Sequence, residues 1–126
     1  MPSPALRARP DPAAVLTRAT LAAAERLDLR QRDLAAVLGT SEASISRLQH
    51  RGARVVQPAT KQGELALLFL RAWRSLDAMV GGDDAAARAW LHAHNHHLGG
   101  VPAQLIRSAE GLVRVVQYLD AMRGRL

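Results

Sequence analysis

The middle of the N-terminal half contains two short helix-forming stretches that are separated by only three residues. Residues 31–52 read QRDLAAVLGTSEASISRLQHRG. Gly39 can adopt the positive φ that ends a helix and Ser41 has an N-cap side chain, so helices are predicted over 31–38 and 42–51. Helices joined so closely cross at a steep angle, with a small residue where they touch. The residues suited to that contact are Ala35 and, on the shared apolar face, Leu34, Leu38, Ile45 and Leu48.

The second of these stretches has an outward face that suits nucleic acid. With Ile45 and Leu48 directed inward, the opposite face carries small, hydroxyl, cationic and imidazole side chains. Arg47 can donate two hydrogen bonds to a guanine edge, and backbone N–H groups at the start of the helix can bind phosphate. An ordinary helical corner with a solvated outer face is the alternative. The predicted DNA-binding residues are Ser41, Glu42, Ala43, Ser44, Ser46, Arg47, His50 and Arg51.

The spacing of Gln31, Ala35, Gly39, Ile45 and Leu48 resembles the helix-turn-helix of the Xre/Cro repressor family. This resemblance implies that the second helix enters the major groove of operator DNA. A single unit binds weakly, so specific recognition requires a homodimer that reads two half-sites about one helical turn apart.

The composition favours a small all-α protein. The chain has 126 residues, which suffice for one compact domain or for two small helical domains that share a core. Aromatic residues make up only 3%, whereas Ala, Leu and Arg abound. The 17 Lys and Arg residues against 11 Asp and Glu give a net charge of +6, which suits a polyanionic partner. With no cysteine and no apolar run long enough to span a bilayer, we expect a cytoplasmic protein without a membrane partner.

Five further helices are predicted outside the 31–52 segment. The first begins with Asp11 as N-cap and extends to about Leu29, with Val15, Ala19, Ala22, Ala23 and Arg26 at helical spacing. Residues 52–60 are interpreted as an extended linker or a short strand. The remaining helices are expected over about 65–80, 83–94 and 102–107, and from Ser108 to near the end of the chain.

A rigid corner is predicted between the fifth and sixth of these seven helices. Asn95, Gly99 and Gly100 interrupt the helical periodicity, so a helix ends before them. Leu98 is expected to enter the core, and both glycines are expected to adopt conformations forbidden to bulkier residues. Pro102 then starts a new helix.

The corner and the last helix resemble the toxin-binding domain of MbcA/ParS/Xre-type antitoxins. The matching residues are Trp90, Asn95, Leu98, Gly99, Gly100, Pro102, Leu105, Ile106, Gly111, Val115 and Leu119. Together with the helix-turn-helix, the resemblance covers about residues 30–126, although 92–94 and Ser108 depart from the family pattern. Residues 1–10 contain three prolines and two arginines with no apolar periodicity, so they are interpreted as a flexible arm. We expect a DNA-binding region over 11–58 and a toxin-binding or dimerisation domain over 59–126.

The same resemblance implies a type II antitoxin that neutralises a separate RES-domain toxin, an enzyme that consumes NAD+, and represses the operon encoding both. By analogy, the C-terminal end blocks entry of NAD+ to the toxin. Taken without the resemblance, the last residues are interpreted as a frayed terminus whose arginines favour the helix dipole. The alternative function is a stand-alone Xre-like repressor whose C-terminal half dimerises or senses a ligand. The toxin-binding residues implied are Asn95, Gly99, Gly100, Pro102, Arg123, Arg125 and Leu126.

No motif for catalysis or for a cofactor is present in the sequence. There is no GxSxG elbow, P-loop or GxGxxG fingerprint, so we predict neither enzyme activity nor a cofactor. His92 and His96 are one helical turn apart, but catalytic zinc needs three protein ligands. We therefore predict no metal site and expect exposed histidines. Trp73 and Trp90 are expected to anchor the core.

Overall fold

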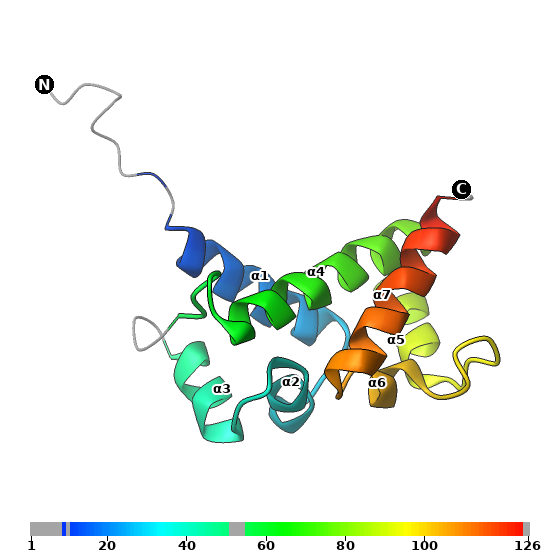
Figure 1. Ribbon diagram of the computed structural model, residues 1–126. Coiled ribbons are helices and arrows are strands. Elements are labelled where there is room, and N and C mark those ends of the chain that lie inside the picture. Colours follow the sequence, from blue (N-terminus) through cyan, green and yellow to red (C-terminus); the bar gives the residue numbers. More distant parts are fainter. Residues whose placement is uncertain (1–8, 10, 51–54, 125–126) are drawn as a thin grey trace, which may run out of the picture.

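The computed structural model describes residues 9, 11–50 and 55–124, and these residues form seven helices (Figure 1). The prediction of an all-α fold is confirmed. Part of the predicted arm, Arg51 and the last two residues lie outside the described residues. The helices are α1 (Pro12–Arg26), α2 (Gln31–Leu38), α3 (Glu42–Gln49), α4 (Lys61–Met79), α5 (Asp84–His92), α6 (Pro102–Leu105) and α7 (Ala109–Arg123).

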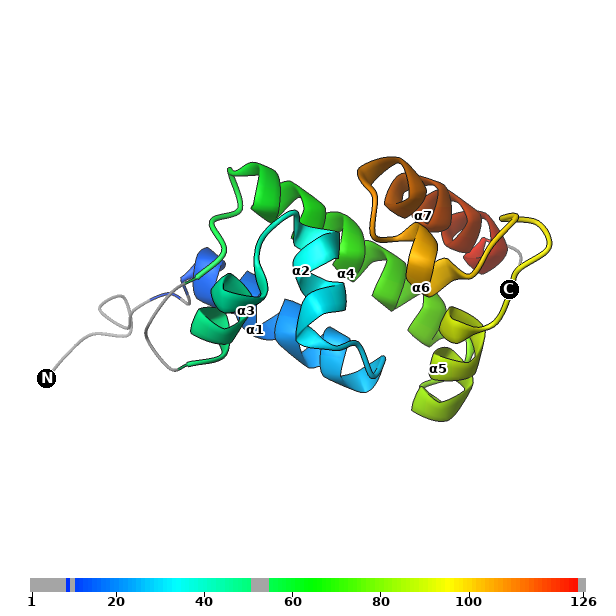
Figure 2. The same ribbon diagram turned by 90° about the horizontal axis from the view of Figure 1, so that it is seen from below.

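The long helix α4 connects the two halves of the molecule. It packs most extensively against α7 and also contacts α1, α2 and α5. In Figure 2, α4 extends from the group formed by α1, α2 and α3 to the group formed by α5, α6 and α7. Buried side chains from both groups belong to one hydrophobic cluster, in which Leu27, Phe69 and Leu119 line the same small void. One continuous core therefore supports both halves.

Most helix starts follow the N-cap chemistry that the sequence predicts. The side chains of Asp11, Ser41, Asp83 and Ser108 accept hydrogen bonds from backbone N–H groups in the first turns of α1, α3, α5 and α7. Thr60 caps α4 in the same way, so that helix begins at Lys61, four residues before its predicted start. These caps satisfy N–H groups that have no partner within the helix.

Several predicted helix ends are too late. Helix α1 ends at Arg26 rather than near Leu29, because Asp28 adopts a left-handed φ of 56°. Helix α5 ends at His92 and α6 at Leu105, each two residues before the predicted end. In the linker, residues 55–60 contain a turn and no strand, which confirms the linker interpretation for this described part. The predicted domain boundary after Pro58 falls within that turn.

The buried face of α1 differs from the stripe identified in the sequence. Val15 is 44% exposed and Ala22 is also exposed. The face that packs into the core instead contains Leu16, Thr17 and Thr20. Each threonine hydroxyl donates to the backbone carbonyl four residues earlier, at 2.7 Å. A hydroxyl satisfied in this way can be buried, so an apolar pattern alone selects the wrong face.

Thr17 also joins α1 to the linker, and its removal is expected to destabilise the protein. Its hydroxyl oxygen accepts a hydrogen bond from the buried N–H of Val56 at 2.8 Å. Thr17→Val should lower the free energy of unfolding by about 2 kcal/mol, because the N–H is left without a partner. The matched control is Thr20→Val, since the Thr20 hydroxyl donates to the Leu16 carbonyl within α1. Equal effects of both variants in urea unfolding would contradict this role of Thr17.

Candidate functional site

Helices α2 and α3 form the steeply crossing pair that the sequence predicts. Gly39 ends α2 with a φ of 66°, and Thr40 donates from its N–H to the carbonyl of Ala35 at 2.9 Å. Ile45 is fully buried at the centre of the pair, and Leu48 is half-buried against the core. Helix α2 packs on α4 and α3 packs on α2, so α3 is attached to the core through α2.

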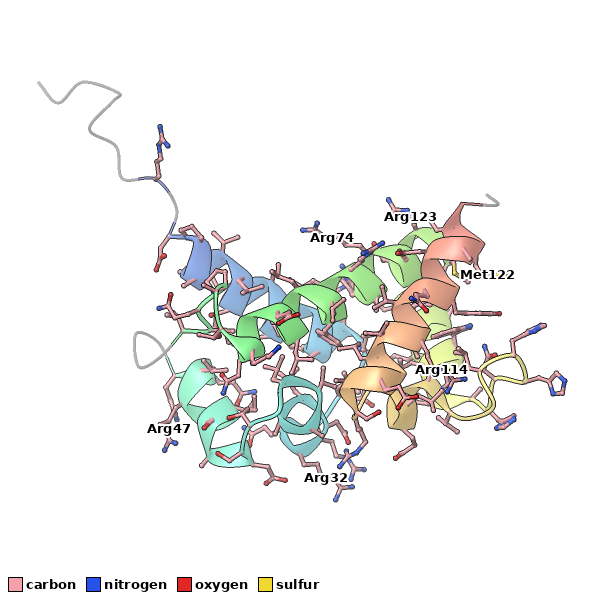
Figure 3. All side chains as sticks on the ribbon, in the orientation of Figure 1. Arg32, Arg47, Arg74, Arg114, Met122 and Arg123 are labelled. Carbon is pink, nitrogen blue, oxygen red and sulfur yellow. The ribbon has the colours of Figure 1, made fainter. Side chains whose placement is uncertain are left out.

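The outward face of α3 presents the cationic and small side chains predicted for DNA binding. Ala43, Arg47 and His50 are exposed, and no carboxylate among the described residues pairs with Arg47. Figure 3 shows Arg47 projecting away from the body of the protein. An unpaired guanidinium on an exposed helix face can contact either base edges or phosphates.

The polar residues at the start of α3 are partly occupied by local contacts. The Ser41 oxygen accepts from the Ser44 N–H at 3.1 Å, and its hydroxyl donates to the Ser44 hydroxyl oxygen at 3.0 Å. Ser46 is half-buried, whereas Glu42 is exposed in the first turn. Ser41 and Ser44 therefore shape the helix start, where backbone N–H groups are available to an anion. Arg51 lies outside the described residues.

Two polar residues of α2 that were not among the predicted contacts lie close to this face. The Gln31 side-chain amide donates to the Gln49 side chain at 2.5 Å, which joins the start of α2 to the end of α3. Arg32 is exposed and projects from the same edge of the molecule as Arg47 (Figure 3). The excess of arginine in the sequence indicated a polyanionic partner in general. The fold was needed to show that Arg32 lies at the same edge of the molecule as Arg47.

The predicted corner is a compact hydrogen-bonded loop organised by Asn95. Its N–H donates to the carbonyl of Gly100 at 2.8 Å, and its own carbonyl accepts from the N–H of Gly99 at 2.9 Å. Its side-chain oxygen accepts from the N–H of Leu98 at 3.0 Å, and Leu98 is buried as predicted. The buried Pro102 then begins α6.

The two glycines of the corner are needed for different reasons. Gly99 has a left-handed φ of 72°, as predicted. The same expectation for Gly100 is wrong, because its φ is not positive. A Cβ atom at Gly100 would instead lie 3.3 Å from a methyl carbon of Leu105. Gly100 therefore allows the loop to pack closely on α6.

Polar contacts attach the C-terminal half to the α1–α2 turn. Arg26 pairs with Asp84 at 2.9 Å, and this hydrogen bond and charge raise the pKa of the Arg26 guanidinium. Arg88 donates to the carbonyl of Arg26 at 2.7 Å. On the other side of the turn, Arg107 pairs with Asp33 at 2.7 Å, and Asp33 also accepts from the N–H of Arg30, the N-cap residue of α2. The corner and the α2–α3 pair are thereby held in a defined relative orientation.

The C-terminal end of α7 lies on a different side of the molecule from α3. Arg123 is exposed in the last turn, and it lines a shallow groove with Leu67, Leu70, Arg71 and Arg74 of α4. Figure 3 shows Arg74 and Arg123 at one edge and Arg47 at the opposite edge. The other two terminal residues proposed to contact a toxin, Arg125 and Leu126, lie outside the described residues.

The histidines and tryptophans follow their predictions only in part. His92, His94, His96 and His97 are exposed, and the described residues contain no group of three His, Asp or Glu side chains placed to hold a metal ion. The imidazole of His92 lies 3.2 Å from the Leu27 carbonyl oxygen. Trp73 is buried in the core, as predicted. Trp90 is half-buried: it packs against the core cluster and also stacks on Tyr118, so its prediction as a core anchor is confirmed only in part.

The matches of the two halves to known families define a helix-turn-helix protein with a second, partner-binding domain. Residues 6–71 match the antitoxin Xre-like helix-turn-helix domain, and residues 75–125 match the antitoxin Xre/MbcA/ParS C-terminal toxin-binding domain. This chain belongs to the Xre/MbcA/ParS family of antitoxins. Membership of this antitoxin family agrees with the prediction of a regulator.

The fold is also shared with a solved structure. The chain resembles a chain in the crystal structure of the M. tuberculosis MbcT–MbcA toxin–antitoxin complex, with a TM-score of 0.63 and 23% sequence identity. The similarity covers 89% of this chain and 96% of that chain. No curated protein matches this chain in sequence. Each helix in the part of the chain described by the structure is too short or too polar to cross a membrane.

Proposed function

We propose that this antitoxin neutralises a RES-domain toxin that consumes NAD+ and represses its own operon as a homodimer. The observation that carries the proposal is the placement of Arg47 and Arg123 at opposite edges of one continuous core (Figure 3). With this arrangement, operator DNA and a toxin can be bound by one chain without overlap. Neither role requires a cofactor or a catalytic group in this chain.

In the proposed DNA complex, α3 lies in the major groove and Arg47 reads a base edge. Ala43, Ser46 and His50 complete the contact face, and the N-terminal end of α3 by Ser41, Glu42 and Ser44 approaches a phosphate. Arg51 adds a further cation after the helix. A homodimer supplies two such helices to two half-sites. The support for this role is that Arg47 is exposed and pairs with no carboxylate in the described part of the chain.

In the proposed toxin complex, the C-terminal end of the chain occludes the NAD+ site of the enzyme. Arg123, Arg125 and the carboxylate of Leu126 enter the cleft, and the exposed Gly99 of the corner contacts the toxin surface. Asn95, Gly100 and Pro102 contribute by giving the corner its shape, since they organise or support the loop. Membership of a family with a toxin-binding domain over 75–125 supports this role.

The two roles are expected to be separable by mutation. Arg47→Ala should reduce affinity for DNA from upstream of its own gene about 5- to 150-fold, the effect of losing a bidentate base contact. Neutralisation of the toxin in a growth assay should stay intact. Deletion of residues 123–126 should have the reverse effect, and Arg74→Ala, at the edge opposite α3, is the matched control for DNA binding.

Two results would contradict the proposal. Loss of both activities in either variant would indicate misfolding or a shared surface rather than two separate ones. If the wild-type chain binds its upstream DNA but does not neutralise the enzyme encoded beside it, the chain is a stand-alone repressor.

A further inference from the structure

The distribution of aromatic residues marks one place on the surface. The chain has only two Trp, one Tyr and one Phe. Phe69 and Trp73 are in the core, 1% and 8% exposed. The other two, Trp90 of α5 and Tyr118 of α7, are half-buried and stack with ring centroids 6.2 Å apart and planes inclined by 18°. Two of the four aromatic residues of the chain therefore lie together at one position near the surface.

The stack continues into the corner. The imidazole of the exposed His97 lies 6.1 Å from the Tyr118 ring, with the planes 27° apart, and His96 meets His97 edge-on. Arg114 of α7 donates a hydrogen bond to the carbonyl of Leu98 at 2.7 Å. The corner is thus attached to α7 by a ring contact and a hydrogen bond. Rings held in this way lose little conformational freedom on binding, which favours affinity.

A hollow of about 320 Å³ lies beside these rings. It is lined by His97, Tyr118, Ala121 and Met122, and Ala121 is exposed at its edge. Aromatic residues next to a small concavity are typical of the residues that dominate the energy of protein–protein interfaces. All the residues of the stack and the hollow lie within the range 75–125 that matches a toxin-binding domain.

We propose that this aromatic shelf, defined as Trp90, His97, Tyr118 and Ala121, is an anchor point for the toxin. An apolar side chain of the toxin enters the hollow and packs on the Tyr118 and His97 rings. The inference rests on the proposed function and adds a second contact to the C-terminal segment, because the shelf lies on the corner and the middle of α7. Tyr118 and His97 then determine the affinity for the toxin, whereas the C-terminal segment occludes the NAD+ site.

The test fills the hollow without removing a core contact. Ala121→Glu places a charged side chain at the exposed edge of the hollow and keeps a good helix former in α7. It should weaken binding to the purified product of the neighbouring gene about 30-fold or more, as expected at an interface hot spot. His97→Ala should weaken binding by about 10-fold, and Tyr118→Phe, which keeps the ring, should bind within about 3-fold of wild type. The matched control is Ala22→Glu, the same change at an exposed position of α1.

The outcomes separate this proposal from the proposed function. Wild type that fails to bind the neighbouring product contradicts the proposed function itself. If the wild type and Ala121→Glu bind the neighbouring product equally well, the aromatic shelf is not an anchor point for the toxin. The proposed function is unaffected by that result. Circular dichroism melting must match wild type for each variant. A homodimer that dissociates in Ala121→Glu while toxin binding persists assigns the shelf to a second copy of this chain and also overturns the proposal.

Discussion

Replacing Gly111 by alanine is expected to lower the free energy of unfolding by about 3 kcal/mol or more. In an isolated helix this substitution stabilises by up to about 1 kcal/mol. In this protein, a Cβ atom at Gly111 would lie 1.9 Å from the carbonyl oxygen of Leu105 and 2.7 Å from its carbonyl carbon. Backbone atoms cannot move aside as a side chain can, so α6 and α7 must separate and lose packing. Chemical unfolding in urea measures the difference.

The control for this prediction is the same substitution where there is room. Gly124→Ala would place a Cβ atom 3.5 Å from the nearest backbone oxygen, an ordinary contact. Its unfolding free energy should differ from wild type by less than about 0.5 kcal/mol. If Gly111→Ala is as stable as Gly124→Ala, the close approach of α6 to α7 described above is incorrect.

Phe69→Ala is expected to destabilise both halves of the protein together. Phe69 is 1% exposed on α4, where it borders a void with Leu27, the residue directly after α1, and with Leu119 of α7. Truncation of a buried phenylalanine costs about 3–5 kcal/mol because of lost burial and the cavity that remains. Since the core is continuous, the variant should still unfold in a single transition, with DNA and toxin binding lost at the same denaturant concentration.

The matched control for Phe69→Ala is Leu67→Ala on the same helix. Leu67 is 51% exposed, so its truncation should change the unfolding free energy by about 0.5 kcal/mol or less. Two separate transitions in Phe69→Ala, one for each half, would show that the halves fold independently and that α4 does not couple them.

Local sequence signals predicted the helix-turn-helix closely. Gly39, Ser41 and the apolar spacing around Ile45 act within a few residues of one another, and α2 has the bounds that were predicted. The corner was also recognisable, because Gly99 and Pro102 each restrict the backbone directly. Such residues determine local conformation through their own covalent geometry, so little depends on distant contacts.

The errors arose where a residue's role depends on a partner distant in sequence. Thr17 and Thr20 did not appear apolar, yet both are buried because their hydroxyls are satisfied. Gly100 is required by the proximity of Leu105 rather than by its own φ. Trp90 packs against the core as predicted, but it is only half-buried, because its ring also stacks on Tyr118 of α7.

The all-α class, the α2–α3 pair and the family could be inferred from the amino-acid sequence, since they depend on periodicity, caps, glycines and motifs along the chain. The folded structure was needed to show that α4 joins both halves through one core and that Arg47 and Arg123 lie at opposite edges. It alone brought His97 onto Tyr118 to form the aromatic shelf. The physical reason is that packing pairs surfaces that are distant in sequence, and no local pattern specifies which residues will meet.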